Sequence, residues 1–198
     1  IVRRNTIRRT WAAGVFVENS PNRPHVVEYN LMEDVGQQPC GWTGGVCLGR
    51  NSSSTIVRHN TIVRPKNGGI TLQGTPNGQF VQNLDIRDNL VICEGSDPFV
   101  VERSGRGNAN TNWRNNLWRN TSNPRWGFLG GTDGASNNTF WNTPTFYTTL
   151  QAWSAARGGL VTNNLTSDPL VNSSYVPQSG SPLINAATDG LDIGKEQT

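Results

Sequence analysis

A short motif built around asparagine recurs along the whole chain, and it limits the possible folds more than any other feature. Each copy has an apolar or small residue three positions before the asparagine, as in Val57-Arg58-His59-Asn60-Thr61-Ile62. The central asparagines are Asn5, Asn30, Asn60, Asn89, Asn116, Asn138 and Asn164. Their spacings are 25, 30, 29, 27, 22 and 26 residues. A period of this length is typical of solenoids, in which each repeat stacks on the next.

Short segments of alternating apolar residues lie between the asparagine motifs. Residues 14–17, 45–48 and 69–72 each begin with glycine, and residues 98–101 and 125–128 occupy the same place in the next two repeats. The alternation predicts short strands separated by loops rich in Gly, Asn, Pro and Ser. Each repeat therefore holds three short strands and forms one turn of a coil. Propeller repeats are longer, at about 40–45 residues, and do not fit this spacing.

We expect each central asparagine to form a corner between two strands, because asparagine tolerates the left-handed backbone conformation better than most residues. Stacked asparagine side chains can then hydrogen-bond from turn to turn, about 4.8 Å apart. The residues three positions before and two positions after the asparagine are expected to point into the core. In the first five motifs these are Val2 and Ile7, Val27 and Met32, Val57 and Ile62, Ile86 and Val91, and Trp113 and Trp118.

Charge and cysteine content exclude several classes of protein. The 198 residues carry 17 Lys and Arg against 14 Asp and Glu, without a basic block, so no nucleic-acid partner is expected. No apolar run reaches the roughly 18 residues that span a membrane. Cys40, Cys47 and Cys93 form no CxxC pair, which disfavours a structural zinc site. Either Cys40 and Cys47 form a disulfide and leave Cys93 free, or all three are unpaired thiols.

The asparagine repeats resemble those of the right-handed parallel β-helix in the pectin-lyase-like superfamily. Residues 150–158 and 180–186 are similar to the closing region of many bacterial secreted β-helix proteins. The resemblance implies an all-β, single-stranded right-handed parallel β-helix of about seven coils, with one short lateral helix near residues 148–157. It implies one domain over 1–198, truncated at its N-terminal end, with an irregular capping segment at 168–198. It also implies a secreted or cell-surface protein.

Relatives of this fold bind substrate along the outer face of one strand ladder, which the resemblance places here on the strands between the asparagine motifs. In the fourth of these, Phe99 and Val101 are expected to point inward and Val100 and Glu102 outward. A lyase acting on uronic acids needs a base, a group that neutralises the carboxylate and often calcium. Residues of suitable type are Lys66, Glu102 and Arg103 for catalysis, Glu94 and Asp97 for Ca²⁺, and Glu18, Arg50 and Gln73 for substrate binding. The alternative is that these are ordinary solvated charges.

A second outward row lies two residues before each corner asparagine and holds Arg3, Glu28, Arg58, Arg87 and Arg114. Arg3 and Arg58 can each pair with Glu28 across one turn. The last three arginines would stack like charges, which is unfavourable unless an anion lies along them. We expect them to bind acidic polysaccharide. The alternative is that they splay apart or pair with Asp88 and its neighbours.

The chain lacks the paired aspartates of polygalacturonases and the Arg-x-Pro-x-x-Arg motif of pectate lyases. Two functions therefore stay open. One is a carbohydrate-associated protein, lyase-like or hydrolase-like, that acts on acidic polysaccharide. The other is a non-catalytic scaffold or glycan-binding surface protein that self-associates through exposed coil ends as a homo-oligomer.

Overall fold

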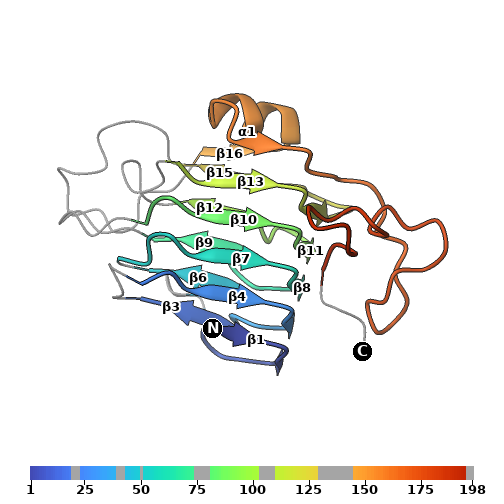
Figure 1. Cartoon of the computed structure of the whole chain (residues 1–198), viewed down its shortest axis with the longest axis horizontal. Coiled ribbons are helices and arrows are strands. Elements are labelled where there is room, and N and C mark those ends of the chain that lie inside the picture. Colours follow the sequence, from blue (N-terminus) through green and yellow to red (C-terminus); the bar gives the residue numbers. More distant parts are fainter. Residues whose placement is uncertain are drawn as a thin grey trace.

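The computed structural model of the chain describes residues 1–18, 23–38, 43–49, 51–73, 81–102, 110–128 and 145–194. They form a solenoid in which each turn contributes one short strand to each of three parallel sheets (Figure 1). The expected all-β parallel solenoid with one short helix is confirmed. No helix in this described part is long and apolar enough to cross a membrane.

The three sheets run side by side along the stack. Sheet A contains β1 (Val2–Arg3), β4 (Val26–Glu28), β7 (Ile56–Arg58), β10 (Asp85–Arg87), β13 (Asn112–Arg114) and β17 (Val161–Thr162). Sheet B contains β2 (Thr6–Arg8), β5 (Leu31–Glu33), β8 (Thr61–Val63), β11 (Leu90–Ile92) and β14 (Leu117–Arg119). Sheet C contains β3 (Val15–Val17), β6 (Val46–Leu48), β9 (Ile70–Leu72), β12 (Val100–Glu102), β15 (Trp126–Phe128) and the antiparallel β16 (Thr145–Tyr147).

The solenoid has fewer turns than the repeat count predicted. Sheet B is five-stranded, and about four full turns join its strands, where about seven coils were expected. The motif at Asn138 lies outside the described residues. Strand β17, which precedes Asn164, pairs directly with β13, which precedes Asn116. Sheet A therefore has no additional turn between these two motifs.

Asparagine side chains form a hydrogen-bonded ladder along the corner between sheets A and B. The Nδ2 of Asn60 donates to Oδ1 of Asn89 at 3.0 Å, and the backbone N–H of Asn60 donates to the same oxygen at 3.0 Å. The same two contacts recur at every described rung from Asn5 to Asn164. The predicted stacking of asparagines from turn to turn is confirmed.

The left-handed residue at each corner is the one before the asparagine, so the prediction that asparagine adopts this conformation is wrong. His59 has φ 51° and Asp88 has φ 58°, whereas Asn60 is not among the residues with positive φ. The asparagine is needed for its side chain instead. Its amide donates to the main-chain oxygen two residues back, as Asn60 does to Arg58 at 2.9 Å, and so closes the corner.

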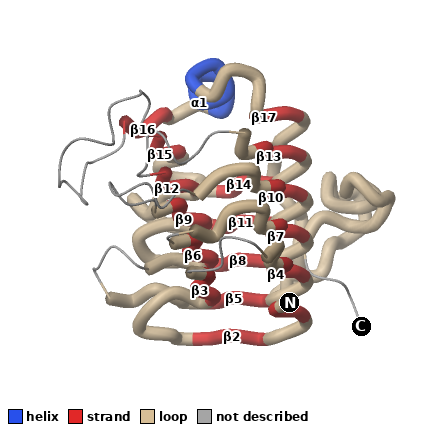
Figure 2. Tube along the Cα trace, turned by 60° about the vertical axis from the view of Figure 1, so that its left-hand side comes forward, coloured by secondary structure: helices blue, strands red, loops and turns tan. Residues whose placement is uncertain are grey.

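Inward-facing side chains fill the interior as predicted. The residues flanking the second to fifth asparagines are at most 1% exposed, namely Val27, Met32, Val57, Ile62, Ile86, Val91, Trp113 and Trp118. The helix α1 (Leu150–Ala156) follows its N-cap Thr149 and lies at the C-terminal end of the stack (Figure 2). Its Trp153 is fully buried, with its ring stacked on Trp126 at a centroid distance of 5.9 Å. Trp153 is therefore a packing residue.

Residues 168–194, here called the C-terminal strap, run outside the stack beside the corner between sheets A and B (Figures 1 and 2). They form no named helix or strand. Leu183 and Ile193 of the strap pack against Leu90 and Leu117, so the strap buries apolar side chains that point out of sheet B.

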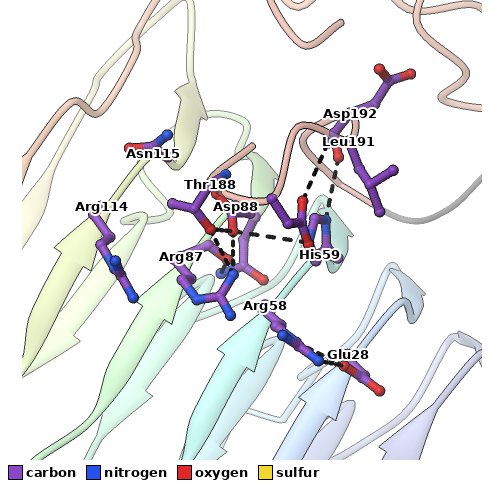
Figure 3. A network of polar contacts seen from close by, with 12 residues as sticks. Glu28, Arg58, His59, Arg87, Asp88, Arg114, Asn115, Thr188, Leu191 and Asp192 are labelled. Atoms are coloured by element: carbon purple, nitrogen blue, oxygen red, sulfur yellow. Dashed lines mark hydrogen bonds and ion pairs between the residues drawn. The ribbon is translucent and has the colours of Figure 1, made fainter. Parts of the chain in front are cut away.

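Polar contacts fix the strap to two corner residues (Figure 3). Asp88 accepts hydrogen bonds from the Thr188 backbone N–H at 2.9 Å and from its hydroxyl at 2.6 Å. The Nε2 of His59, a fully buried side chain, lies 2.9 Å from Oδ2 of Asp189. Burial would raise the pKa of Asp189, but the hydrogen bond with His59 keeps it below its ordinary value.

The cysteine alternatives are only partly addressed by the structure. Cys93 is a free, buried thiol, and burial raises its pKa well above its ordinary value. Cys40 lies outside the described residues, so a disulfide between Cys40 and Cys47 stays a prediction.

Candidate functional site

A shallow hollow of about 240 Å³ opens where the chain passes from sheet B into sheet C. It is lined by Asn67, Ser96, Asp97, Pro98, Val101, Arg125 and Phe146. Most of these residues lie at or near the connections that precede β9, β12 and β15, which stack above one another in three successive turns. Phe146 comes from β16, which pairs with β15. Pockets for drug-sized ligands are usually larger, at about 300–1,000 Å³. The hollow suits one sugar ring or one charged group of a longer ligand.

Asp97, whose carboxylate accepts two contacts, forms one wall of the hollow. The Nζ of Lys66 lies 3.0 Å from Oδ2 of Asp97, and the backbone N–H of Asn67 donates to its Oδ1 at 3.1 Å. Asn67 adopts a left-handed backbone with φ 64°, and its side-chain amide donates to the carbonyl oxygens of Gly36 and Gln38. The turn that presents Lys66 is therefore anchored to the previous turn.

Arg125 forms the opposite wall. Its Nη2 donates to the Ser96 carbonyl oxygen, and its guanidinium carbon lies 4.6 Å from the centre of the Phe146 ring. Among the described residues, no carboxylate lies within ion-pair distance of Arg125, and its buried Nε has no hydrogen-bond partner. With Lys66 and Arg125 against Asp97, the hollow carries one excess positive charge beside an aromatic ring.

The structure brings together two of the residues that the sequence singled out, Lys66 and Asp97. Glu94 begins the same turn, and its carbonyl oxygen accepts the Asp97 N–H at 3.2 Å, but its side chain is exposed. The described residues contain no group of three or more His, Cys, Asp or Glu side chains that could hold a metal ion. Calcium binding by Glu94 and Asp97 therefore stays a prediction.

Glu102 points into the solenoid, so its predicted outward orientation is wrong. Strand β12 pairs Val100 with Ile70 and Glu102 with Leu72, one residue out of the expected register. A shift of one residue moves every side chain of a strand to the other face. The expected register aligned Pro98 with the glycine that starts each strand. Instead, Gly69 donates its N–H to the Pro98 oxygen, which places Phe99 beside that glycine.

A buried ion pair accounts for a glutamate in the core. Glu102 is 0% exposed, and its Oε1 lies 3.5 Å from Nε of Arg157 at the C-terminal end of α1. Arg157 also donates to the Thr111 carbonyl oxygen at 3.1 Å. The pair links α1 to the interior of the stack and keeps Glu102 away from Lys66. Arg103, the third expected catalytic residue, lies outside the described residues.

The expected substrate-binding residues of sheet C do not line the hollow. Glu18 follows β3 and is partly exposed, whereas Gln73 follows β9 and is only 4% exposed. Arg50 lies outside the described residues.

The arginines of sheet A are each paired with a carboxylate, and Figure 3 shows the pairs that Arg58 forms with Glu28 and Arg87 with Asp88. Arg58 binds Glu28 at 2.7 Å, and Arg87 binds Asp88 at 2.6 Å. Asp85 lies between two arginines, 2.9 Å from Arg87 and 3.0 Å from Arg114. Burial would raise the pKa of Asp85, but hydrogen bonds from Arg114 and Arg87 lower it below its ordinary value. The alternative in which this row pairs with Asp88 and its neighbours is confirmed, and no bound anion is needed to separate the charges.

Sequence reasoning missed two residues that define the hollow, Arg125 and Phe146. Arg125 was visible only as the start of a predicted strand. Phe146 reaches the site because β16 pairs antiparallel with β15, opposite Gly127. Neither the repeat nor the asparagine spacing predicts that pairing.

Comparisons with known proteins identify no relative. No protein-family model matches the chain, and comparisons with curated proteins and with solved structures also find no match. The function must therefore be argued from the site itself.

Proposed function

We propose that this protein is a secreted or cell-surface β-helix, of the pectin-lyase-like kind, that binds acidic polysaccharide at the hollow. The observation that carries the proposal is Arg125, which lacks a carboxylate partner in the described part of the chain and lies against Phe146. The arginines of sheet A, in contrast, are already neutralised. An anionic ligand would gain most at an arginine whose charge is not yet paired.

The chemistry of the hollow suits a uronate unit. A guanidinium binds a carboxylate through two parallel hydrogen bonds, which fixes the orientation of the bound group. The apolar face of the sugar ring can pack on the aromatic ring of Phe146. The carboxylate of Asp97 and the side-chain oxygen of Asn67 can accept hydrogen bonds from the ring hydroxyls.

Binding is proposed in preference to cleavage. Of the three expected catalytic residues, Lys66 lies beside the hollow and Glu102 lies in the core, and a base must lie within hydrogen-bond reach of the proton that it removes. A lyase-like activity with calcium would need groups beyond those that the described residues bring to this site.

The proposal is tested by measuring the affinity of the full chain for polygalacturonate and alginate oligosaccharides by calorimetry. We expect Arg125→Gln to weaken binding about tenfold or more, since a charge-assisted hydrogen bond contributes about 1.5–3 kcal/mol. Arg114→Gln removes the same charge from sheet A and is expected to leave the affinity within about twofold.

Three further results would decide the matter. Binding that depends on Arg114 and not on Arg125 would move the site to sheet A and overturn the proposal. Absence of binding to every uronate oligosaccharide would also overturn it. Ultraviolet absorbance from an unsaturated product, measured with calcium and with chelator, would show eliminative cleavage and contradict the preference for binding.

A further inference from the structure

The C-terminal strap covers apolar side chains of sheet B and meets the asparagine corner at a buried histidine. Leu90 and Leu117 point out of sheet B, are 0% exposed, and pack against Leu183 and Ile193 of the strap. At the corner before β8, the side chain of His59 is also 0% exposed and contacts the strap through both ring nitrogens (Figure 3). The function proposed above uses neither the strap nor this histidine.

Both ring nitrogens of His59 face oxygen atoms that can only accept hydrogen bonds. Nε2 lies 2.9 Å from Oδ2 of Asp189, and Nδ1 lies 3.3 Å from the carbonyl oxygen of Asp192. Burial would raise the pKa of Asp189, but its contacts lower it below the ordinary value, so Asp189 is a carboxylate at neutral pH. A neutral imidazole has one N–H and one lone pair, whereas an imidazolium has two N–H groups. Either neutral tautomer would therefore direct a buried lone pair at an oxygen atom.

A second carboxylate lies on the Nε2 side of the ring. Oδ2 of the fully buried Asp88 is 3.9 Å from Nε2 of His59, and the same oxygen is bound by Arg87 at 2.6 Å. The docked strap thus brings Asp189 to a corner that already holds a carboxylate. With an imidazolium, the two cations and two carboxylates at this corner balance. With a neutral ring, one negative charge would be left in excess at a buried site, which is unfavourable.

The groups on the remaining sides of His59 belong to the preceding turn and to its own strand. The ring stacks on that of Tyr29 at a centroid distance of 4.8 Å. The guanidinium carbons of Arg3 and Arg4 each lie 5.9 Å from the centre of the Tyr29 ring. Arg58, which precedes the histidine, is bound by a glutamate of the preceding turn at 2.7 Å. The carboxylates that lie close to a ring nitrogen therefore come from the strap and from the next turn.

From this geometry we infer that His59 is an imidazolium while the strap is docked, and that it acts as a latch that opens as the pH rises. Release of the strap would expose the ring to water, where a histidine has a pKa of about 6.5. Docking above this pH takes up one proton, so the docked state loses stability as the pH increases. Below this pH the latch contributes in full. Opening would uncover the apolar side chains of Leu90 and Leu117.

Nitrogen NMR of the isotope-labelled full chain tests the charge of His59 directly. The chain contains two histidines, so His25→Gln assigns the signals by elimination. We expect both ring nitrogens of His59 to be protonated at pH 7.5, where a histidine in water would be about nine-tenths neutral. One protonated and one unprotonated ring nitrogen at this pH would overturn the inference.

Hydrogen exchange of the strap, corrected for the intrinsic effect of pH on exchange, tests the latch. The opening constant of residues 186–193 should rise about three- to tenfold between pH 7.5 and 8.5, tenfold being the limit for one proton. His59→Asn removes the ionisation, and we expect it to remove this rise. Asparagine suits the position, because Asn115 occupies the corresponding corner with φ 51°.

Two further variants keep the test decisive. Asp189→Asn changes a side chain that is 36% exposed, and it should reduce the rise because an amide can donate to a neutral imidazole. Tyr175→Phe removes a strap contact with Glu33, away from His59, and should leave the rise unchanged. An opening constant that does not rise with pH, or that rises equally without His59, would overturn the inference. The inference does not depend on glycan binding at the hollow.

Discussion

At the scale of single residues, the asparagine ladder determines the path of the chain. The side chain of each interior rung asparagine satisfies backbone groups of its own turn and of the preceding turn, and it also bonds the asparagine side chain of the next turn. Asn89, for example, accepts from Asn60 and donates to the Val57 oxygen at 2.9 Å and to Asn116 at 2.9 Å. A buried polar group left without its partner costs about 1–3 kcal/mol. The ladder therefore explains why asparagine recurs at these positions.

Asn89→Ala should lower the free energy of unfolding by about 2–5 kcal/mol, because it leaves the buried N–H of Asn60 without an acceptor and removes the amide that donates to the Val57 and Arg87 oxygens. Asn5→Ala is the matched control at the exposed edge, and we expect it to cost less than about 1 kcal/mol. Urea denaturation measures both values. Equal losses for the two variants would show that the ladder does not stabilise the buried rungs.

The residues that obey the repeat could be predicted from sequence, and those that depart from it could not. The inward positions around Asn30 to Asn116 follow from periodicity alone, because alternate residues of each strand face the interior of the solenoid. Glu102 departs from its predicted outward orientation because Phe99, and not Pro98, lies beside Gly69. The hollow depends on Phe146, which arrives through an antiparallel strand that no repeat specifies.

At the scale of elements, ion pairs connect successive strands on the outside of the stack. In sheet B, Arg64 follows β8 and binds Glu33 and Asp34, while the Tyr175 hydroxyl of the strap donates to Glu33 at 2.7 Å. The hydrogen bond from Tyr175, followed by contacts with Arg64, lowers the pKa of Glu33 despite its partial burial. The hydrogen bond from Arg64 likewise lowers the pKa of Asp34.

These lowered pKa values predict an acid-sensitive contribution to stability. A carboxyl whose pKa is lower in the folded state stabilises the fold above its ordinary pKa, 4.5 for Glu33 and 3.8 for Asp34, and loses this effect as the pH falls through the folded value. Arg64→Gln should therefore destabilise the chain at neutral pH and cost progressively less as the pH falls below about 4. Urea denaturation of both proteins across this range measures the difference. A difference that stays constant with pH would contradict the linkage.

At the scale of the whole molecule, α1 closes the C-terminal end of the solenoid and the strap binds along one side. The closed end is a cluster of buried tryptophans, in which Trp153 of α1 packs edge-on against Trp113 and Trp118 of the stack. In the first turn of the described residues, Trp11 is 67% exposed. The hollow lies toward the closed end, because Phe146 belongs to β16 and Arg125 precedes β15, two strands that α1 contacts.

Trp153→Ala should lower the free energy of unfolding by about 3–5 kcal/mol, because it leaves a cavity at the closed end. Trp11→Ala removes the same side chain from an exposed position, and we expect a change within about 0.5 kcal/mol. Thermal unfolding followed by circular dichroism compares the two. A stable Trp153 variant would show that α1 does not close the stack.

The central claim, that acidic polysaccharide binds at the hollow, is tested most directly by hydrogen exchange of the full chain with and without a saturating uronate oligosaccharide. The account predicts new protection in residues 95–98, 124–126 and 145–147, and none in β7, β10 and β13 of sheet A. Protection along sheet A with no change at the hollow would contradict it.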